Sequence, residues 1–278
     1  MQIGFSLLIA TTIAGPEHLG LMQKIAWAGY DGAEIPISPN RDTRVLKRML
    51  DDLGLSVTAS GGVAHEDRNP MSQDADIRAR GVVELRRLVD AAVALGAEVL
   101  CGPFHQPLGI FSGAGPTPQE WDHLVTAHRA MADHAGDAIR LAIEPLNRFE
   151  CYALNTTADA GRLVAEVDRP GYGYLYDTFH AHIEERDPVA AIAANPPAHV
   201  HISENDRGVP GRGQVDFKAT CRALKAQGYD DWLVVEAFGQ ALPELAAATR
   251  VWRPLFDCED DVITGGIETI RQAWKDEP

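Results

Sequence analysis

Short apolar segments alternate with longer amphipathic segments along the whole chain, and this alternation restricts the fold more than any other feature. Eight short segments have the character of strands, over residues 3–6, 32–35, 55–59, 98–101, 141–144, 172–177, 199–202 and 232–236. Nearly continuous apolar runs of this kind are typical of parallel strands that are buried on both faces. Strict strand–helix alternation with short connections also implies a parallel sheet. Eight such units in 278 residues predict an α/β fold, a closed (β/α)₈ TIM barrel.

Apolar periodicity and capping signals predict the helices between these strands. The clearest helices are expected over residues 16–28, 41–53, 74–95, 156–167 and 216–227, and two more, over 241–252 and 262–275, follow the last strand. No composition break or low-complexity tract interrupts the sequence. Residues 1–278 are therefore expected to form a single TIM-barrel domain with extra C-terminal helices over about 241–275. The doubly wound open sheet is the main rival, but Ser6-Leu-Leu-Ile9 lacks the glycine-rich turn that usually follows its first strand.

Charge and composition argue against several classes of partner. The net charge of −15 disfavours binding to a nucleic-acid backbone or to an anionic membrane surface. The N-terminus shows no signal-peptide pattern, and no apolar run approaches the roughly 18 residues of a membrane span. The four cysteines are far apart and form no CxxC pair, so buried or half-buried thiols in a reducing compartment are expected. We therefore expect a cytoplasmic protein that acts on a small molecule.

Four successive strands, the fifth to the eighth, each end in a side chain that can bind a metal. These residues are Glu144, Asp177, His201 and Glu236, separated by 33, 24 and 35 residues, which is close to the length of one barrel unit. The C-terminal ends of all strands in a TIM barrel meet at one mouth, where active sites lie. Three carboxylates beside an imidazole would repel one another there unless a cation neutralised them. Three carboxylates and one imidazole suit Mn²⁺, Mg²⁺ or Co²⁺. The alternative is that no metal binds and each acid is a helix cap or a surface group.

The residues around these strand ends resemble a known enzyme family. Glu144-Pro-Leu-Asn-Arg-Phe-Glu150, Asp177-Thr-Phe-His180 and His201-Ile-Ser-Glu-Asn-Asp-Arg207, followed by Pro210-Gly-Arg-Gly213, are similar to motifs of the D-tagatose 3-epimerase family. That family includes the D-psicose (allulose) and L-ribulose 3-epimerases and lies among the sugar isomerases with xylose-isomerase-like barrels. Glu236 and the later Ala-Thr-Arg-Val-Trp-Arg253 also fit the pattern. The resemblance is specific from about residue 140 to 253 and only topological before that.

The resemblance implies a metal-dependent isomerase that epimerises ketoses at C3. It makes Glu144, Asp177, His201 and Glu236 the expected ligands of one divalent ion, most often Mn²⁺ with Mg²⁺ or Co²⁺ as alternatives. It also makes Glu144 and Glu236 the catalytic base and acid, which would remove and return the C3 proton through an enediolate. The matching positions Glu150, His180 and Arg207 are expected to bind the sugar. A homodimer or homotetramer is expected as well.

Other residues near the strand ends are weaker candidates for the site. Glu34 ends the second strand and is expected to face the mouth, where it would touch the substrate or support the site. His65, in the loop after the third strand, and Phe104 and His105, in the loop after the fourth, are expected as pocket walls. His199 shares the parity of His201 and should point inward one layer deeper.

Other functions stay open on the sequence alone. The same metal site would serve an aldose–ketose isomerase or a dehydratase acting on a hydroxypyruvate- or inosose-type keto-sugar. Hydrolytic DNA repair uses the same barrel, but it needs more metal-binding histidines and a basic groove, which the net charge disfavours. A non-catalytic sugar-binding barrel is the remaining alternative. The family often has aromatic residues after the first strand, where this chain has Ser6-Leu-Leu-Ile9, so the sugar itself is not specified.

Overall fold

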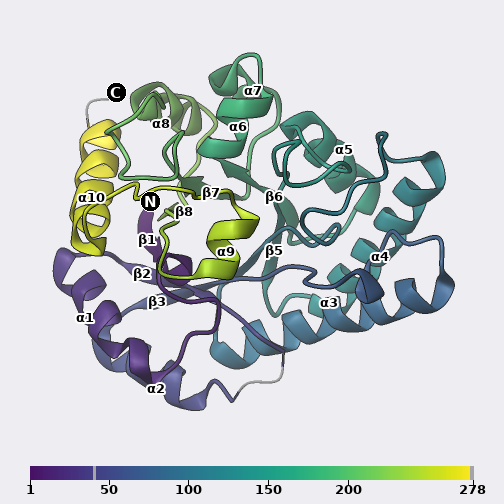
Figure 1. Cartoon of the computed structure of the whole chain (residues 1–278), viewed down its shortest axis with the longest axis horizontal. Coiled ribbons are helices and arrows are strands. Elements are labelled where there is room, and N and C mark those ends of the chain that lie inside the picture. The colour runs from purple at the N-terminus through teal and green to yellow at the C-terminus, as the bar shows by residue number, and fades with distance from the viewer. Residues whose placement is uncertain (40–41, 276–278) are drawn as a thin grey trace.

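Eight parallel strands close into a barrel in sequence order in the computed structural model, which describes residues 1–39 and 42–275 (Figure 1). The last strand pairs with the first, so the sheet has no open edge. The strands are β1 (Gln2–Ser6), β2 (Gly32–Pro36), β3 (Ser56–Ser60), β4 (Val99–Gly102), β5 (Arg140–Ile143), β6 (Tyr172–Asp177), β7 (His199–Ile202) and β8 (Trp232–Val235). The predicted (β/α)₈ TIM barrel is confirmed.

Helices surround the barrel and connect its strands (Figure 1). They are α1 (Leu19–Ala28), α2 (Arg44–Leu53), α3 (Ala75–Leu95), α4 (Pro118–Ala135), α5 (Thr157–Val167), α6 (Thr178–Glu184), α7 (Pro188–Ala194), α8 (Phe217–Ala226), α9 (Pro243–Ala248) and α10 (Glu259–Lys275). The predicted second helix began at residue 41, which lies outside the described residues, and α2 itself begins at Arg44. The two C-terminal helices that follow β8 are α9 and α10.

Two helices differ from the sequence-based expectation for local reasons. The helix expected over 241–252 ends already at Ala248, because Arg250 adopts a left-handed conformation (φ 61°) that an α-helix cannot continue. The segment after β6, for which no helix was predicted, forms the short helix α6. The Asp177 side chain caps this helix by accepting hydrogen bonds from the backbone N–H groups of Phe179 and His180, at 2.6 and 3.2 Å.

Three hydrophobic clusters form the core of the described residues, and the two larger ones lie on opposite sides of the sheet. The larger of these two joins the outward-facing strand residues to the helices. The smaller of the two consists of six buried residues of opposite strand parity, which face the barrel interior: Val99, Cys101, Ala142, Leu175, Trp232 and Val234. Trp232 fills the end of the barrel where the strands begin, and a Cβ atom at Gly32 would lie 2.5 Å from its indole ring. Above this apolar floor the interior becomes polar, with Glu34, His199 and His201 fully or almost fully buried.

Two further expectations concern the burial of the cysteines and the absence of a membrane-spanning segment. Cys101, Cys151 and Cys221 are buried, as expected, whereas Cys258 is exposed because it lies on the surface segment before α10. Over residues 1–39 and 42–275, no helix has the length and apolar character that crossing a bilayer requires.

Candidate active site

The four strand-end residues Glu144, Asp177, His201 and Glu236 converge at the mouth of the barrel. One ligand atom from each lies within 4.8 Å of those of the other three, and all four side chains are buried. Asp177 and His201 are direct neighbours across β6 and β7. Glu144 and Glu236 immediately follow β5 and β8. The backbone N–H of Glu144 donates to the carbonyl of Gly102 in β4 at 3.0 Å, and that of Glu236 donates to the carbonyl of Ile202 in β7 at 3.1 Å. The parallel sheet thus fixes the four backbones that present these side chains.

The donor atoms of this set fit a hard or borderline divalent ion. His201 Nδ1 faces the three carboxylates, at 3.5 Å from Glu236 Oε1, 3.6 Å from Asp177 Oδ2 and 4.0 Å from Glu144 Oε1. The same Nδ1 is buried and makes no hydrogen bond to any residue that the structure describes. A nitrogen lone pair in this position is costly to bury unless it has a partner, and a metal ion would supply one. Three oxygen donors and one imidazole suit Mn²⁺, Mg²⁺ or Co²⁺.

Arg207 brings a positive charge into the same cluster. Its Nη1 lies 2.7 Å from Glu236 Oε2 and 3.1 Å from Asp177 Oδ2, and the side chain is 4% exposed. The guanidinium group stacks over the rings of Phe179 and Phe238, with its carbon 3.9 and 4.6 Å from the two ring centroids. Arg207 also has a backbone φ of 63°, a strained conformation for a residue with a side chain. Such strain is typical of functional sites, where the surroundings hold a residue in place.

The surroundings of Glu144 and Asp177 shift the pKa values of their carboxyl groups in opposite directions. Burial raises the pKa of Glu144 well above its ordinary value; the charges of His201 and Arg207 oppose this effect, and the negative charges of Glu236 and Asp177 add to it. Burial acts on Asp177 as well, but the charge of Arg207 and the neighbouring His201 hold the pKa of Asp177 far below its usual range. Glu144 can therefore take up a proton while Asp177 stays ionised, which is the division expected of an acid–base site.

His180 and Glu150 are positioned beside the cluster by Asn147. The backbone N–H of Asn147 donates to His180 Nδ1 at 3.0 Å, and its side-chain amide donates to Glu150 Oε1 at 2.7 Å. The other ring nitrogen, Nε2, lies 3.6 Å from Glu144 Oε1 and 2.9 Å from Arg207 Nη2. His180 thus lies between Asn147 and Arg207, beside the carboxylate of Glu144.

The electrostatic surroundings keep His180 neutral and raise the pKa of Glu150. Burial and the neighbouring charge of Arg207 lower the pKa of His180 to about 3. Burial raises the pKa of Glu150, although Arg207 and the amide of Asn147 oppose this effect. His180 is therefore neutral near pH 7 and not a cation.

Glu34 occupies a different place from the one expected. It lies in the middle of β2, which continues to Pro36, and it is wholly buried inside the barrel instead of facing the mouth. Its Oε2 is 3.0 Å from His199 Nε2, and its Oε1 is 3.0 Å from His201 Nε2. Glu34 therefore lies below the strand-end set and contacts it through His201. His199 points inward one layer deeper than His201, as its parity predicted.

The remaining candidates from the loops after β3 and β4 divide into buried and exposed residues. Phe104 and His105 are fully buried, and neither ring nitrogen of His105 has a hydrogen-bond partner among the described residues. Burial and the nearby His128 lower the pKa of His105 to about 3. His65 is exposed and precedes the short 3₁₀ helix Glu66–Arg68. The structure thus brings none of these three into hydrogen-bonding contact with the strand-end set over the described residues.

Several residues that support the site carried too little signal to be singled out from the sequence. Ser203 Oγ accepts from Arg207 Nη1 at 2.8 Å, and Phe179 and Phe238 form the two sides of the slot that holds the guanidinium. Phe179 and Phe238 each follow a strand-end acid by two residues, at Asp177 and Glu236. That shared spacing was the available signal, but an aromatic residue near a strand end is usually part of the core.

Comparison with known proteins places this geometry in context. The profile of a family described as xylose isomerase-like TIM barrel matches residues 22–255. A probable ketose 3-epimerase from Synechocystis sp. is 31% identical over 266 residues, which cover 94% of this chain and 92% of that protein. A ketose 3-epimerase from Arthrobacter globiformis is 33% identical, over 92% of this chain and 91% of its own. The crystal structure of a D-allulose 3-epimerase from Methylomonas sp. in complex with D-allulose has a TM-score of 0.92 at 31% identity, covering 98% of this chain and 97% of the other.

Proposed function

Because the chain belongs to the xylose isomerase-like TIM barrel family and is an isomerase of the sugar epimerase class, we propose that it is a divalent-metal-dependent ketose 3-epimerase. The observation that carries this proposal is the convergence of Glu144, Asp177, His201 and Glu236 at the barrel mouth. We further propose that the ion is Mn²⁺, with Mg²⁺ or Co²⁺ as substitutes, and that these four residues hold it. When bound, such an ion would polarise the ketone and stabilise negative charge on the sugar oxygens.

The two glutamates give the site a pair of acid–base groups. In the proposed reaction Glu144 accepts the proton from C3, and the electrons of the C–H bond form the C2–C3 double bond of an enediolate. Glu236 then delivers a proton to the opposite face of C3, the ketone reforms, and the configuration is inverted. The raised pKa of Glu144 supports its role as the group that carries a proton during turnover. A single base acting between C1 and C2 would instead interconvert an aldose and a ketose.

Arg207, His180 and Glu150 are proposed to bind the sugar. Arg207 Nη2 and His180 Nε2 lie 2.9 Å apart, and this pair would contact the carbonyl end or a hydroxyl oxygen of the ketose. Glu150 is held by Asn147 on the same side of the mouth and would accept or donate a hydrogen bond at a hydroxyl group. Burial of all three side chains keeps water away from the carbon that changes configuration, which strengthens these polar contacts.

An exchange experiment in D₂O tests the reaction directly. The purified protein is stripped of metal, analysed for its native ion, reloaded with Mn²⁺ or Mg²⁺, and incubated with a panel of free ketoses that includes D-allulose, D-tagatose and L-ribulose. We expect the C3 signal of at least one ketose to disappear from the proton spectrum as its 3-epimer accumulates. Exchange at C1 of an aldose–ketose pair, or loss of water from the sugar, would instead show an isomerase or a dehydratase. Absence of both metal and exchange would favour a non-catalytic sugar-binding barrel.

A further inference from the structure

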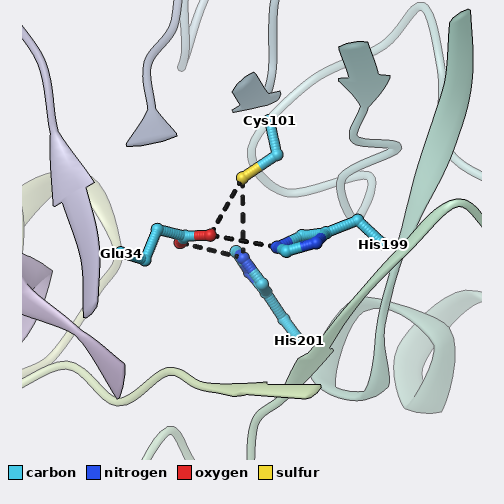
Figure 2. A group of neighbouring side chains, drawn as sticks. All are labelled: Glu34, Cys101, His199 and His201. Carbon is cyan, nitrogen blue, oxygen red and sulfur yellow. Dashed lines mark hydrogen bonds and ion pairs between the residues drawn. The ribbon is translucent and has the colours of Figure 1, made fainter. Parts of the chain in front are cut away.

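A second group of ionisable side chains lies inside the barrel, directly below the strand-end set. Figure 2 shows Glu34, Cys101, His199 and His201 pointing toward one another from β2, β4 and β7. All four are at most 1% exposed. We call these four residues the interior cluster. Its only member shared with the strand-end set is His201.

The carboxylate of Glu34 is the centre of the interior cluster. Its Oε2 lies 3.0 Å from His199 Nε2 and 3.2 Å from both Cys101 Sγ and Thr58 Oγ1. Each of these three groups can donate a proton, so Oε2 is surrounded by donors. The other oxygen, Oε1, makes no hydrogen bond of good angle within the described part of the chain, and His201 Nε2, 3.0 Å away, is the donor placed to meet it. A buried carboxylate is stable only when such partners satisfy both of its oxygens.

His201 connects the two groups through its two ring nitrogens. Nε2 faces down to Glu34, and Nδ1 faces up to the three strand-end carboxylates. A neutral imidazole carries one proton, so a proton held on Nε2 leaves the lone pair of Nδ1 free to bind an ion. If the proton moved to Nδ1, it would point into the proposed metal position and block it.

We propose that Glu34 is a positioning residue that holds the proton of His201 on Nε2 and fixes the ring with Nδ1 aimed at the metal position. This inference rests on the proposed function, since it assigns a purpose to His201 as a ligand. His199 and Cys101 support Glu34 from its other oxygen and keep the carboxylate in one orientation. A carboxylate that orients a ligating histidine also raises the basicity of the coordinating nitrogen.

The test compares metal affinity between Glu34→Gln and a matched control. Glutamine keeps the size of the side chain, but its NH₂ group must face one of the two histidine N–H donors, so His199 and His201 can no longer both be satisfied. We expect Mn²⁺ titrated into the metal-free Glu34→Gln protein to bind roughly 10–100-fold more weakly than to wild type. Thr58→Val removes one neighbour of the same carboxylate without touching His201, and we expect its Mn²⁺ affinity to stay within about threefold of wild type. Circular dichroism and thermal melts establish that the metal-free variants are folded.

The outcomes separate this inference from the proposed function. Wild-type protein that binds no Mn²⁺ would overturn the function, whereas wild-type binding with an unchanged affinity in Glu34→Gln would overturn only the role of Glu34. Equal weakening in Glu34→Gln and Thr58→Val would also overturn it, because that result indicates general destabilisation. Uptake of a second equivalent of Zn²⁺ that is lost in Cys101→Ala would show that the interior cluster is itself a ligand set and not a support.

A measurement on the wild-type protein keeps the inference testable if Glu34→Gln fails to fold. With Mg²⁺ bound, the histidine side-chain ¹H–¹⁵N spectrum should show His201 protonated on Nε2, with a downfield proton that exchanges slowly because it is buried and hydrogen-bonded to Glu34. A His201 ring protonated on Nδ1, or an Nε2 proton without the shift of a hydrogen bond, would contradict the proposal.

Discussion

In the proposed mechanism Glu144 has two tasks that make opposite demands on its protonation. As a ligand it would be ionised, and as a base it would accept a proton; burial next to Asp177 and Glu236 raises its pKa and so favours the second state. Asp177 is held ionised by Arg207 and is fixed further by capping α6, so its role is restricted to that of an anion. The different tasks of these acids follow from their neighbours, because the carboxyl groups themselves are chemically alike.

Replacing either glutamate by glutamine should separate chemistry from binding. Glu144→Gln and Glu236→Gln keep an oxygen ligand but cannot accept or deliver the C3 proton, so we expect at least a 10²–10⁴-fold loss of C3 exchange in D₂O. Mn²⁺ binding should be weakened but still measurable by titration. Glu268→Gln, at an exposed position on α10, serves as the control and should exchange at the wild-type rate. Near-normal exchange in either site variant would exclude the two-base mechanism.

The sequence predicted which four residues meet at the barrel mouth, but it did not predict how deep inside the barrel a fifth residue, Glu34, lies. Glu144, Asp177, His201 and Glu236 could be found because the C-terminal ends of parallel strands converge, and this holds whatever the exact register. Glu34 was expected at the mouth because strand ends are uncertain by a few residues in a sequence. Two further residues in β2 place it inside the barrel, where it contacts His201 instead of substrate.

Helix α6 could not be predicted from the sequence. Its seven residues are too few to show an apolar period, and its cap, Asp177, already had an explanation as a strand-end ligand. The Asp177 carboxylate caps α6 through Oδ1, which accepts from the helix backbone, while Oδ2 faces His201 and Arg207. The longer helices were predicted because 10 to 21 residues give a clear periodicity.

The contact between α4 and β6 should make stability depend on pH. His128 of α4 is fully buried and its Nδ1 is hydrogen-bonded to the hydroxyl of Tyr172. Burial lowers the pKa of His128 from 6.5 to about 4, so between these pH values the unfolded chain binds a proton that the folded chain does not. This contribution to stability is complete above pH 6.5 and is lost as the pH falls toward 4, at up to about 1.4 kcal/mol per pH unit.

Urea unfolding of wild type and His128→Gln at pH 8, 7, 6 and 5 measures this effect. Glutamine can still hydrogen-bond Tyr172 but does not titrate, so the free energy of unfolding should fall less steeply with decreasing pH in the variant. The difference between the two proteins should be constant at pH 7 and 8, which provides the internal control. Parallel curves down to pH 5 would show that His128 does not carry the dependence.

The whole molecule carries a net charge of −15 and places three carboxylates together at the barrel mouth. Arg207 is the one cation among the described residues that bridges two of them. A divalent ion that binds only the folded barrel should therefore stabilise it, by about 2.7 kcal/mol at 100 times the dissociation constant. For a chain of this length the melting temperature should rise by roughly 5–10 °C.

Thermal unfolding with EDTA and with Mn²⁺ at that concentration tests the prediction. Asp177→Asn is the informative comparison, because it removes one anion of the set and should show a much smaller rise. A melting temperature that is the same in EDTA and in Mn²⁺ would argue that no ion binds at the mouth.

The alternation of strands and helices was enough to predict the whole barrel, since eight repeats restrict the topology to one closed sheet. It could not predict how side chains from opposite halves meet in the interior. That depends on the stagger of the strands, which is a property of the closed sheet and is not encoded in any one segment. Glu34 of β2 and Cys101 of β4 thus meet His199 and His201 of β7, from the other half of the barrel.

This contact has a consequence for engineering substrate range. All four strand-end residues lie at the ends of β5 to β8. By that criterion alone, β1–β4 could be replaced by the matching half of another sugar isomerase. The tie from Glu34 to His201 makes the two halves interdependent. A chimera that replaces β1–β4 should keep a carboxylate at position 34, whereas the loops that leave these strands can be exchanged freely. Recombination libraries of this barrel should therefore keep the contact between Glu34 and His201 constant.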